Sequence, residues 1–388
     1  MALPLRISTQ QANEDKVLVE EKSSARILTL NRPRQLNVLF HDILHECVSV
    51  NEISRLLELF TAYEEDSNVK LIIIKGKGRA FSAGGDIVSV VRDINEGNWR
   101  SGVKIFWEQF IFIYVLATYH KTQVSILNGI VMGGGVGASI HGRFRVATEN
   151  TVFAMPETAL GLFPDEGASY FLSRLPGCFG EYVGLTGTRL DGAEMLACGL
   201  ATHFVPSVKL SLLEEALCKV DSIDPAIISE IIDEYSEKPY LKEQSSYHRL
   251  DVINRCFSQR TVEDILSALE TEALNMKDNW ISFTIQSMKR ASPVSLKISL
   301  RSIRQGRFQD LGQCLVREYR MVCHIMQGKG YRAILLEKDG NPKWEPSRLE
   351  FVTDDMVELY FSMVDDEEWE ELKLPARSNL LLSAIAKL

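Results

Sequence analysis

Two glycine-rich loops, each placed directly after an apolar run, constrain the fold of this chain more than any other feature. The run Val69–Lys75 leads into a loop that ends at residues 84–86, Gly-Gly-Asp. A second run, Val124–Leu127, leads through Asn-Gly to three consecutive glycines at 133–135. Short β-branched runs indicate buried strands, and glycine lets a backbone approach a ligand closely. Because the order strand, loop, helix occurs twice, we expect stacked β/α turns whose loops open on one side.

The remaining hydrophobic pattern predicts an α/β first half and a helical second half. Val17–Glu20 and Arg26–Leu30 are typical of a hairpin, and apolar spacing predicts helices over 52–64 and 87–119. From about residue 209 long amphipathic helices dominate, and the acidic stretch 353–372 is typical of a surface helix. We therefore predict a flexible leader at 1–15, a catalytic domain at 16–206 and a mainly helical region at 207–388.

Composition excludes several classes of protein. The net charge of -9 argues against a nucleic-acid binder, and no run of about 18 apolar residues is present that would span a membrane. The 7 cysteines form no Cys-x-x-Cys pair and indicate reduced thiols inside a cell. The chain ends in Ala386-Lys387-Leu388, which is similar to the Ser-Lys-Leu address. We therefore expect an import receptor as a partner and the peroxisome as the location.

The candidate site residues are two glycines and two carboxylates. If the glycine loops face one another, the N–H groups of Gly85 and Gly134 can bind one carbonyl oxygen. Glu157 and Asp165 follow about twenty residues later and can move protons or attack a carbonyl carbon. Two structural alternatives stay open: Glu157 as a surface residue after a proline, and Asp165 as the N-cap of a helix that begins near Gly167.

The motifs that carry these residues resemble the crotonase (enoyl-CoA hydratase/isomerase) superfamily. The resemblance rests on Gly78–Asp86 together with Asn128–Gly135. Residues 153–165 and 341–346 are most similar to 3-hydroxyisobutyryl-CoA hydrolases, with the plant peroxisomal form as the nearest match. The resemblance extends from about residue 15 to the end of the chain. It implies a spiral of ββα turns followed by a helical C-terminal region, with an acyl-CoA thioester as the substrate.

The resemblance also implies a role for each site residue. Crotonase-type hydratases use two glutamates, and here the first of these positions is Gly137 while Glu157 matches the second. The pair Glu157 and Asp165 matches the hydrolases, in which Glu157 would attack the thioester or activate water. Gln109 takes a position where these hydrolases usually carry a substrate-contacting glutamate. A hydratase or isomerase, and a catalytically impaired acyl-CoA-binding paralogue, remain as alternatives.

Four departures from the hydrolase pattern motivate the paralogue alternative. They are Gln109, Glu166 in place of an apolar residue, a longer stretch at 40–51 and a shortened turn at 328–331. As a second acid, Glu166 would either raise the pKa of Asp165 or lie in solvent at the helix start. The last two departures are changes of length at element boundaries.

Other clusters indicate no further chemistry. His41 and His45 have the spacing of a helical zinc pair, but they lack the usual glutamate, so we predict no metal site. We expect no separate cofactor, because coenzyme A is part of the substrate. The basic series 289–307 could bind coenzyme A phosphates, although a solvated helix face is the simpler interpretation. A homo-oligomer is possible, as in much of the superfamily.

Overall fold

The computed structural model describes residues 15–39, 52–86, 96–97, 99–275, 278–328 and 343–377. Several sequence predictions therefore lie outside the described residues. These are residues 1–14 of the leader predicted at 1–15, the longer stretch at 40–51 with its histidine pair, the first part of the helix predicted over 87–119, most of the shortened turn at 328–331, and the C-terminal tripeptide 386–388.

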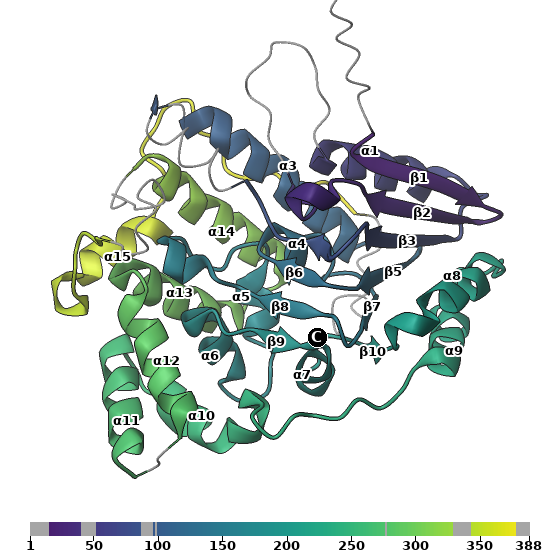
Figure 1. The fold of residues 1–388 in the computed structure, drawn as a ribbon. Coiled ribbons are helices and arrows are strands. Elements are labelled where there is room, and N and C mark those ends of the chain that lie inside the picture. The colour runs from purple at the N-terminus through teal and green to yellow at the C-terminus, as the bar shows by residue number, and fades with distance from the viewer. Residues whose placement is uncertain are drawn as a thin grey trace, which may run out of the picture.

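The larger of two sheets has six strands in the order β1-β2-β3-β5-β7-β10 (Figure 1). The first two strands form the predicted antiparallel hairpin, and every later neighbour pairs in parallel. All residues of β2 and β5 are buried, as expected for strands covered on both faces. The strands are β1 (Val17–Lys22), β2 (Ala25–Leu30), β3 (Leu71–Gly76), β5 (Thr122–Leu127), β7 (Phe144–Ala147) and β10 (His203–Phe204).

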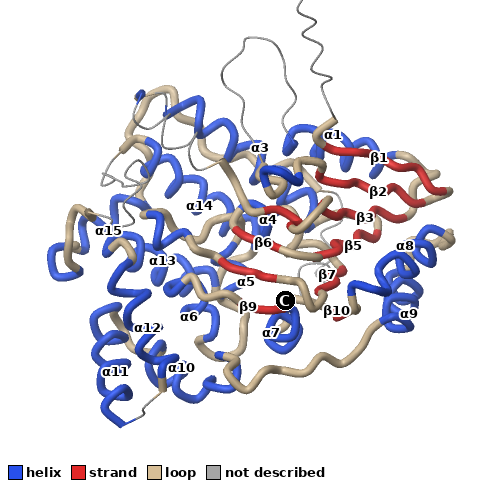
Figure 2. Tube along the Cα trace, in the orientation of Figure 1, coloured by secondary structure: helices blue, strands red, loops and turns tan. Residues whose placement is uncertain are grey.

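The smaller sheet has the order β4-β6-β8-β9 and shows how the chain winds. After β3, β5 and β7 of the larger sheet, the chain crosses to β4, β6 and β8 of the smaller one. Successive turns therefore stack, which confirms the predicted spiral of ββα turns (Figure 2). The strands are β4 (Ala80–Ser82), β6 (Ile130–Met132), β8 (Val152–Ala154) and the antiparallel β9 (Leu190–Asp191).

Helices join the turns of the spiral and predominate in the described chain after β10. Those before β10 are α1 (Glu52–Glu65), α3 (Trp99–Ala117), α4 (Gly134–Gly137), α5 (Ala168–Leu172), α6 (Phe179–Thr186) and α7 (Gly192–Cys198). Those after it are α8 (Leu210–Cys218), α9 (Pro225–Tyr235), α10 (Leu250–Phe257), α11 (Val262–Asn275), α12 (Asn279–Arg290), α13 (Pro293–Gly306), α14 (Leu311–Met326) and α15 (Asp354–Phe361).

The helical region packs closely on the spiral. Helix α14 lies against α3, and side chains such as Phe110, Ile113, Leu315 and Tyr319 form a shared core (Figure 1). Helices α8 and α9 instead cover the larger sheet, where Leu213 joins the strand residues of a separate core. The helix α14 therefore borders the central turns of the spiral, where the glycine loops lie.

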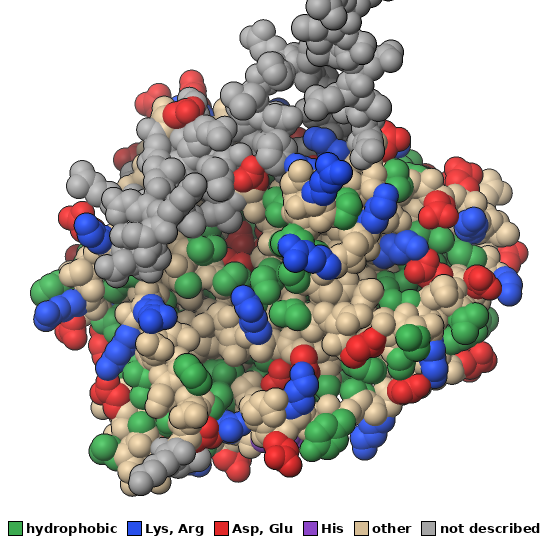
Figure 3. All heavy atoms as spheres, in the orientation of Figure 1, with side chains coloured by type: hydrophobic (Ala, Val, Ile, Leu, Met, Phe, Trp, Pro, Cys, Tyr) green, Lys and Arg blue, Asp and Glu red, His purple; other side chains and the backbone are tan. Residues whose placement is uncertain are grey.

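The structure tests two predictions about surface charge, one for the acidic stretch 353–372 and one for the basic series 289–307. The acidic helix predicted over 353–372 is too long, because α15 ends at Phe361 and Ser362 has extended backbone. The basic series is largely paired with the protein's own acids, as in Lys297 with Glu263 at 2.7 Å and Arg307 with Glu181 at 2.9 Å. On the face shown in Figure 3, acidic and basic side chains are interspersed. Among the described residues, no helix has the length and apolar character needed to cross a membrane.

Candidate active site

The two glycine loops meet at the ends of neighbouring strands. Strands β4 and β6 pair in parallel, so the loops that follow them emerge at the same edge. A Cβ atom placed on Gly134 would lie 3.3 Å from the backbone nitrogen of Gly85. Gly84 and Gly133 have φ of 108° and 47°, which side-chain-bearing residues rarely adopt. The loops therefore face one another, as the sequence predicted.

The first residues of a helix have N–H groups with no acceptor inside that helix, and Gly134 begins α4. The opposite loop is held in place by the N–H of Leu39, which donates to the carbonyl of Gly84 at 2.8 Å. The backbone N–H groups of Gly134 and Gly85 therefore lie beside the same point between the two loops. This is the arrangement that can hold the oxygen of a polarised carbonyl.

Glu157 lies directly beside these loops. It follows β8 and the Met-Pro pair, and it begins a 3₁₀ turn, Glu157–Leu160. A Cβ on Gly133 would lie 3.2 Å from Glu157 Oε1, and only 6% of the residue is exposed. Glu157 Oε2 has no hydrogen-bond partner among the described residues. The alternative of a surface glutamate is therefore wrong.

The environment of Glu157 also changes its acidity. Burial raises the pKa of Glu157 well above its ordinary value, and Asp165, when it is ionised, raises this pKa further. A carboxylate with a raised pKa is a stronger base once it is ionised. Its unpartnered oxygen makes it available to a reacting atom.

Asp165 lies in the same pocket, just before α5. Burial, followed by the charge of Glu318, raises the pKa of Asp165 to about 8, so the carboxyl group holds a proton at neutral pH. The alternative of a helix N-cap is wrong, because the N-cap residue of α5 is Gly167 and no side chain of its own caps it.

Glu318 on α14 takes the capping role instead. Its carboxylate accepts from the N–H of Gly167 at 2.7 Å and from the N–H of Ser169 at 2.9 Å, and it is 0% exposed. Sequence reasoning missed this residue because it is 149 positions away from Ser169 in the chain.

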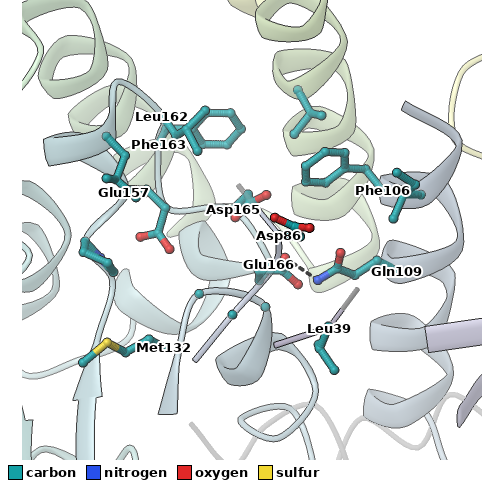
Figure 4. A pocket seen from close by; sticks show the side chains of 18 of the residues that line it. Leu39, Asp86, Phe106, Gln109, Met132, Glu157, Leu162, Phe163, Asp165 and Glu166 are labelled. Carbon is teal, nitrogen blue, oxygen red and sulfur yellow. Dashed lines mark hydrogen bonds between the residues drawn. The ribbon is translucent and has the colours of Figure 1, made fainter. Parts of the chain in front are cut away.

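Glu166 and Gln109 form a hydrogen-bonded pair across the pocket (Figure 4). Gln109 Nε2 donates to Glu166 Oε1 at 2.5 Å. Only 3% of Glu166 is exposed, so the alternative in which it lies in solvent is wrong. Burial, and then the charge of Asp165, raise the pKa of Glu166 well above its ordinary value. The residue has a φ of 63°, and its carbonyl oxygen lies 2.7 Å from His141 Nε2.

Gly137 explains where the Glu166 carboxyl group goes. A Cβ on Gly137 would lie less than 3.0 Å from Glu166 Oε2 and 3.0 Å from Ile113 Cδ1. The absence of a side chain at Gly137 therefore leaves room for a carboxyl group that comes from another element. The sequence shows that Gly137 lacks the acid of the hydratases and that Glu166 is an extra acid, but it does not predict that the two positions lie side by side.

The pocket that contains these groups has a free volume of about 130 Å³. Pockets for drug-sized ligands hold roughly 300–1,000 Å³, so a short acyl group fits better. The carboxyl groups of Glu157, Asp165 and Glu166 line the pocket, and Figure 4 shows Asp86 near Asp165 and Glu166. Apolar side chains from α3, the 160–163 segment and α14 line the rest, namely Phe106, Leu160, Leu162, Val322, Ile325 and Met326.

Asp86 and the wall from α14 were also missed. Asp86 ends the first glycine loop, so its place in the motif was a usable signal. The α14 residues carry no such signal, because an apolar helix face predicts burial and does not identify what it covers.

Comparison with known proteins gives four matches over most of the chain. A family model described as enoyl-CoA hydratase/isomerase matches residues 25–361. The chain is 65% identical to 3-hydroxyisobutyryl-CoA hydrolase 1 of Arabidopsis thaliana, over 98% of this chain and 100% of that protein. It is 44% identical to the small ribosomal subunit protein mS47 of the same plant, over 96% and 91% of the two chains. The crystal structure of a carnitinyl-CoA dehydratase from Mycobacterium thermoresistibile superposes with a TM-score of 0.81 at 30% identity, over 94% and 100%.

Proposed function

The chain belongs to the enoyl-CoA hydratase/isomerase, or crotonase, family, and we propose that it hydrolyses 3-hydroxyisobutyryl-CoA to 3-hydroxyisobutyrate and free coenzyme A. The observation that carries the proposal is the position of Glu157, buried beside the two facing glycine loops. The name of the Arabidopsis hydrolase at 65% identity supports the choice of substrate. The reaction is a step of valine breakdown, and it consumes only the thioester and water, so no separate cofactor is needed.

The backbone donors act first in the proposed reaction. The N–H groups of Gly85 and Gly134 bind the thioester oxygen and stabilise the negative charge that develops on it when the carbonyl carbon is attacked. Loss of one such donor typically costs about 10²–10³ in rate. Because these donors are backbone groups on neighbouring loops, their placement depends on the glycine conformations at 84 and 133.

Glu157 and Asp165 then divide the proton chemistry. Glu157 either attacks the carbonyl carbon, giving a mixed anhydride, or takes a proton from an attacking water. Asp165, whose pKa is raised to about 8, donates its proton to the departing thiolate. Trapping with hydroxylamine separates the two routes for Glu157, since a hydroxamate on this side chain forms only from the anhydride.

The experiment that tests the function is release of free thiol from a panel of short acyl-CoA esters by the purified chain. We expect release from 3-hydroxyisobutyryl-CoA, and none from this ester after Glu157→Gln. Equal release by both proteins would contradict the proposal. Binding of the esters with no turnover would instead support the impaired paralogue. A relative at 44% identity is named as a ribosomal protein and not as a hydrolase.

Hydration of an enoyl-CoA is the second candidate, and one observation favours it. Glu166 places a carboxyl group beside Gly137, so two glutamates do share the pocket. The solved relative named as a dehydratase has the same fold. Loss of enoyl-CoA absorbance with no thiol release would establish hydration in place of hydrolysis.

We also propose that the chain is imported into peroxisomes through Ala386-Lys387-Leu388. A fluorescent protein fused to the N-terminus of the full chain should collect in peroxisomes. The same fusion without the last three residues should stay in the cytosol, and unchanged import of the shortened chain would refute the signal.

A further inference from the structure

The buried side chain of Glu166 needs space that Gly137 provides and a backbone conformation that is uncommon for glutamate. Its carboxyl group occupies the space next to Gly137, where a Cβ would come within 3.0 Å of Oε2. Glu166 lies in the turn before α5 with a φ of 63°, a conformation that is uncommon for non-glycine residues. Two groups secure it: the ring of His141 at its carbonyl oxygen and the amide of Gln109 at Oε1.

The second carboxyl oxygen of Glu166 has no such bond. Glu166 Oε2 is buried and has no hydrogen-bond partner among the described residues, although the residue lines the pocket. A buried polar atom without a partner is destabilising for the fold. Since the strained backbone adds to that cost, structural stability alone does not account for a glutamate here. A ligand in the pocket that brings a polar group does account for it.

The position of the Gln109–Glu166 pair relative to the carbonyl site indicates which polar group the ligand brings. Gln109 Nε2 would lie 2.9 Å from a Cβ on Gly134, so the Gln109–Glu166 pair borders the point where the thioester oxygen is held. A hydroxyl group on the β-carbon of an acyl chain lies a few bonds from that oxygen. A carboxylate accepts a hydrogen bond from a hydroxyl, and a carboxylic acid can also donate one.

We propose that Glu166 is a specificity-determining residue, whose Oε2 binds the hydroxyl group of a short 3-hydroxyacyl chain. Gln109 orients this carboxyl group, and Gly137 leaves the space for it. The proposal rests on the proposed function for its substrate class. It adds that the pocket selects hydroxylated acyl groups over otherwise identical chains, because an acyl group without the hydroxyl leaves Oε2 unpaired.

The test compares two esters that differ by one hydroxyl, 3-hydroxyisobutyryl-CoA and isobutyryl-CoA. For the wild-type chain we expect a kcat/KM ratio in favour of the hydroxylated ester of roughly 10- to 100-fold, as one buried hydrogen bond supplies. Glu166→Ala should bring the ratio close to one, mainly through loss of the hydroxylated ester. Glu166→Met keeps the side-chain length without a hydrogen bond and should do the same. Glu166→Gln should preserve most of the preference.

A matched control separates specificity from stability. Glu194 is another buried glutamate, bonded to Ser245 and Ser246 and belonging to the cap of α7 instead of the pocket. Glu194→Ala should lower the stability of the fold and leave the ratio unchanged. The proposal is overturned if Glu166→Ala and Glu166→Met keep the ratio, or if they lower kcat/KM for both esters by the same factor.

Binding measurements keep this test distinct from the test of hydrolysis. In the Glu157→Gln background, calorimetry gives the dissociation constants of both esters without turnover. We expect tighter binding of the hydroxylated ester, and loss of that difference when Glu166→Ala is added. If the wild-type chain releases no thiol but the binding preference depends on Glu166, the proposed function fails and this inference stands. No preference in binding would overturn the inference, whatever the rate of thiol release.

Discussion

Replacing Gly137 by alanine tests the packing of the site directly. In the wild-type chain the new Cβ would lie less than 3.0 Å from Glu166 Oε2, a separation that real Cβ atoms essentially never show. Overpacking of this kind costs about 1–3 kcal/mol. If the carboxyl group moves away instead, its bond to Gln109 breaks, which costs ~1 kcal/mol. We therefore expect Gly137→Ala to lower the free energy of unfolding by about 1–3 kcal/mol.

The same substitution should be nearly harmless once Glu166 is alanine. The remaining neighbour is Ile113 Cδ1 at 3.0 Å, the end of a side chain that can shift. Gly137 has no positive φ, and alanine in place of glycine in a helix gains roughly 0.5–1 kcal/mol. In the Glu166→Ala background we thus expect a cost below about 1 kcal/mol. The coupling between the two sites should be about 1–2 kcal/mol.

The assay is urea unfolding of the wild type, both single variants and the double variant. If Gly137→Ala costs the same in both backgrounds, the two residues do not compete for one space, and the account of the pocket is refuted. Thiol release gives a second readout. Gly137→Ala alone should lose the preference for the hydroxylated ester, because it displaces the carboxyl group that confers this preference.

Three more predictions concern the other acids of the site. Glu157→Gln should reduce thiol release by at least about 10²-fold with stability kept, since it replaces a buried carboxyl of raised pKa by a neutral amide; circular dichroism checks the fold. Asp165 keeps its proton up to about pH 8 in the folded chain, while the unfolded chain releases it near pH 4. Its contribution to stability therefore falls as pH rises between these values, by at most about 1.4 kcal/mol per pH unit; urea unfolding at pH 5 and 7 should show a smaller decline for Asp165→Asn than for the wild type. Glu318→Ala should leave the N–H groups of Gly167 and Ser169 unpaired, at about 1–3 kcal/mol each; lower kcat together with a shifted pH profile is expected, and an unchanged profile would contradict the link to Asp165.

The sequence was sufficient to predict the spiral and the centre of the site. Apolar runs that end in glycine loops are local signals, and β3 and β5 form where these signals lie. Gly85, Gly134, Glu157 and Asp165 belong to short motifs, and the fold brings all of them to one pocket. Local patterns were less reliable for the acidic stretch after 353, where helix α15 is shorter than its charge pattern indicated.

What the sequence did not predict depends on contacts between distant segments. Nothing near Glu318 in the chain marks it as the partner of the 167–169 backbone, since that contact forms only when α14 packs across the spiral. Glu166 was noticed as a departure, but its burial could not be predicted, because the space beside Gly137 exists only in three dimensions. The glycine at 137 can be seen in the sequence, but the sequence does not show that the Glu166 carboxyl group occupies the space beside it.

The bonds from Glu318 to the backbone of Gly167 and Ser169 have a consequence for how this enzyme family can diverge. The loop that carries Asp165 and Glu166 is built by one half of the chain and anchored by the other. Recombination that exchanges only the C-terminal half between two relatives would pair each loop with an anchor from another lineage. A chimaera whose α14 lacks a carboxylate at position 318 would lose this anchor, so the loop and α14 depend on one another.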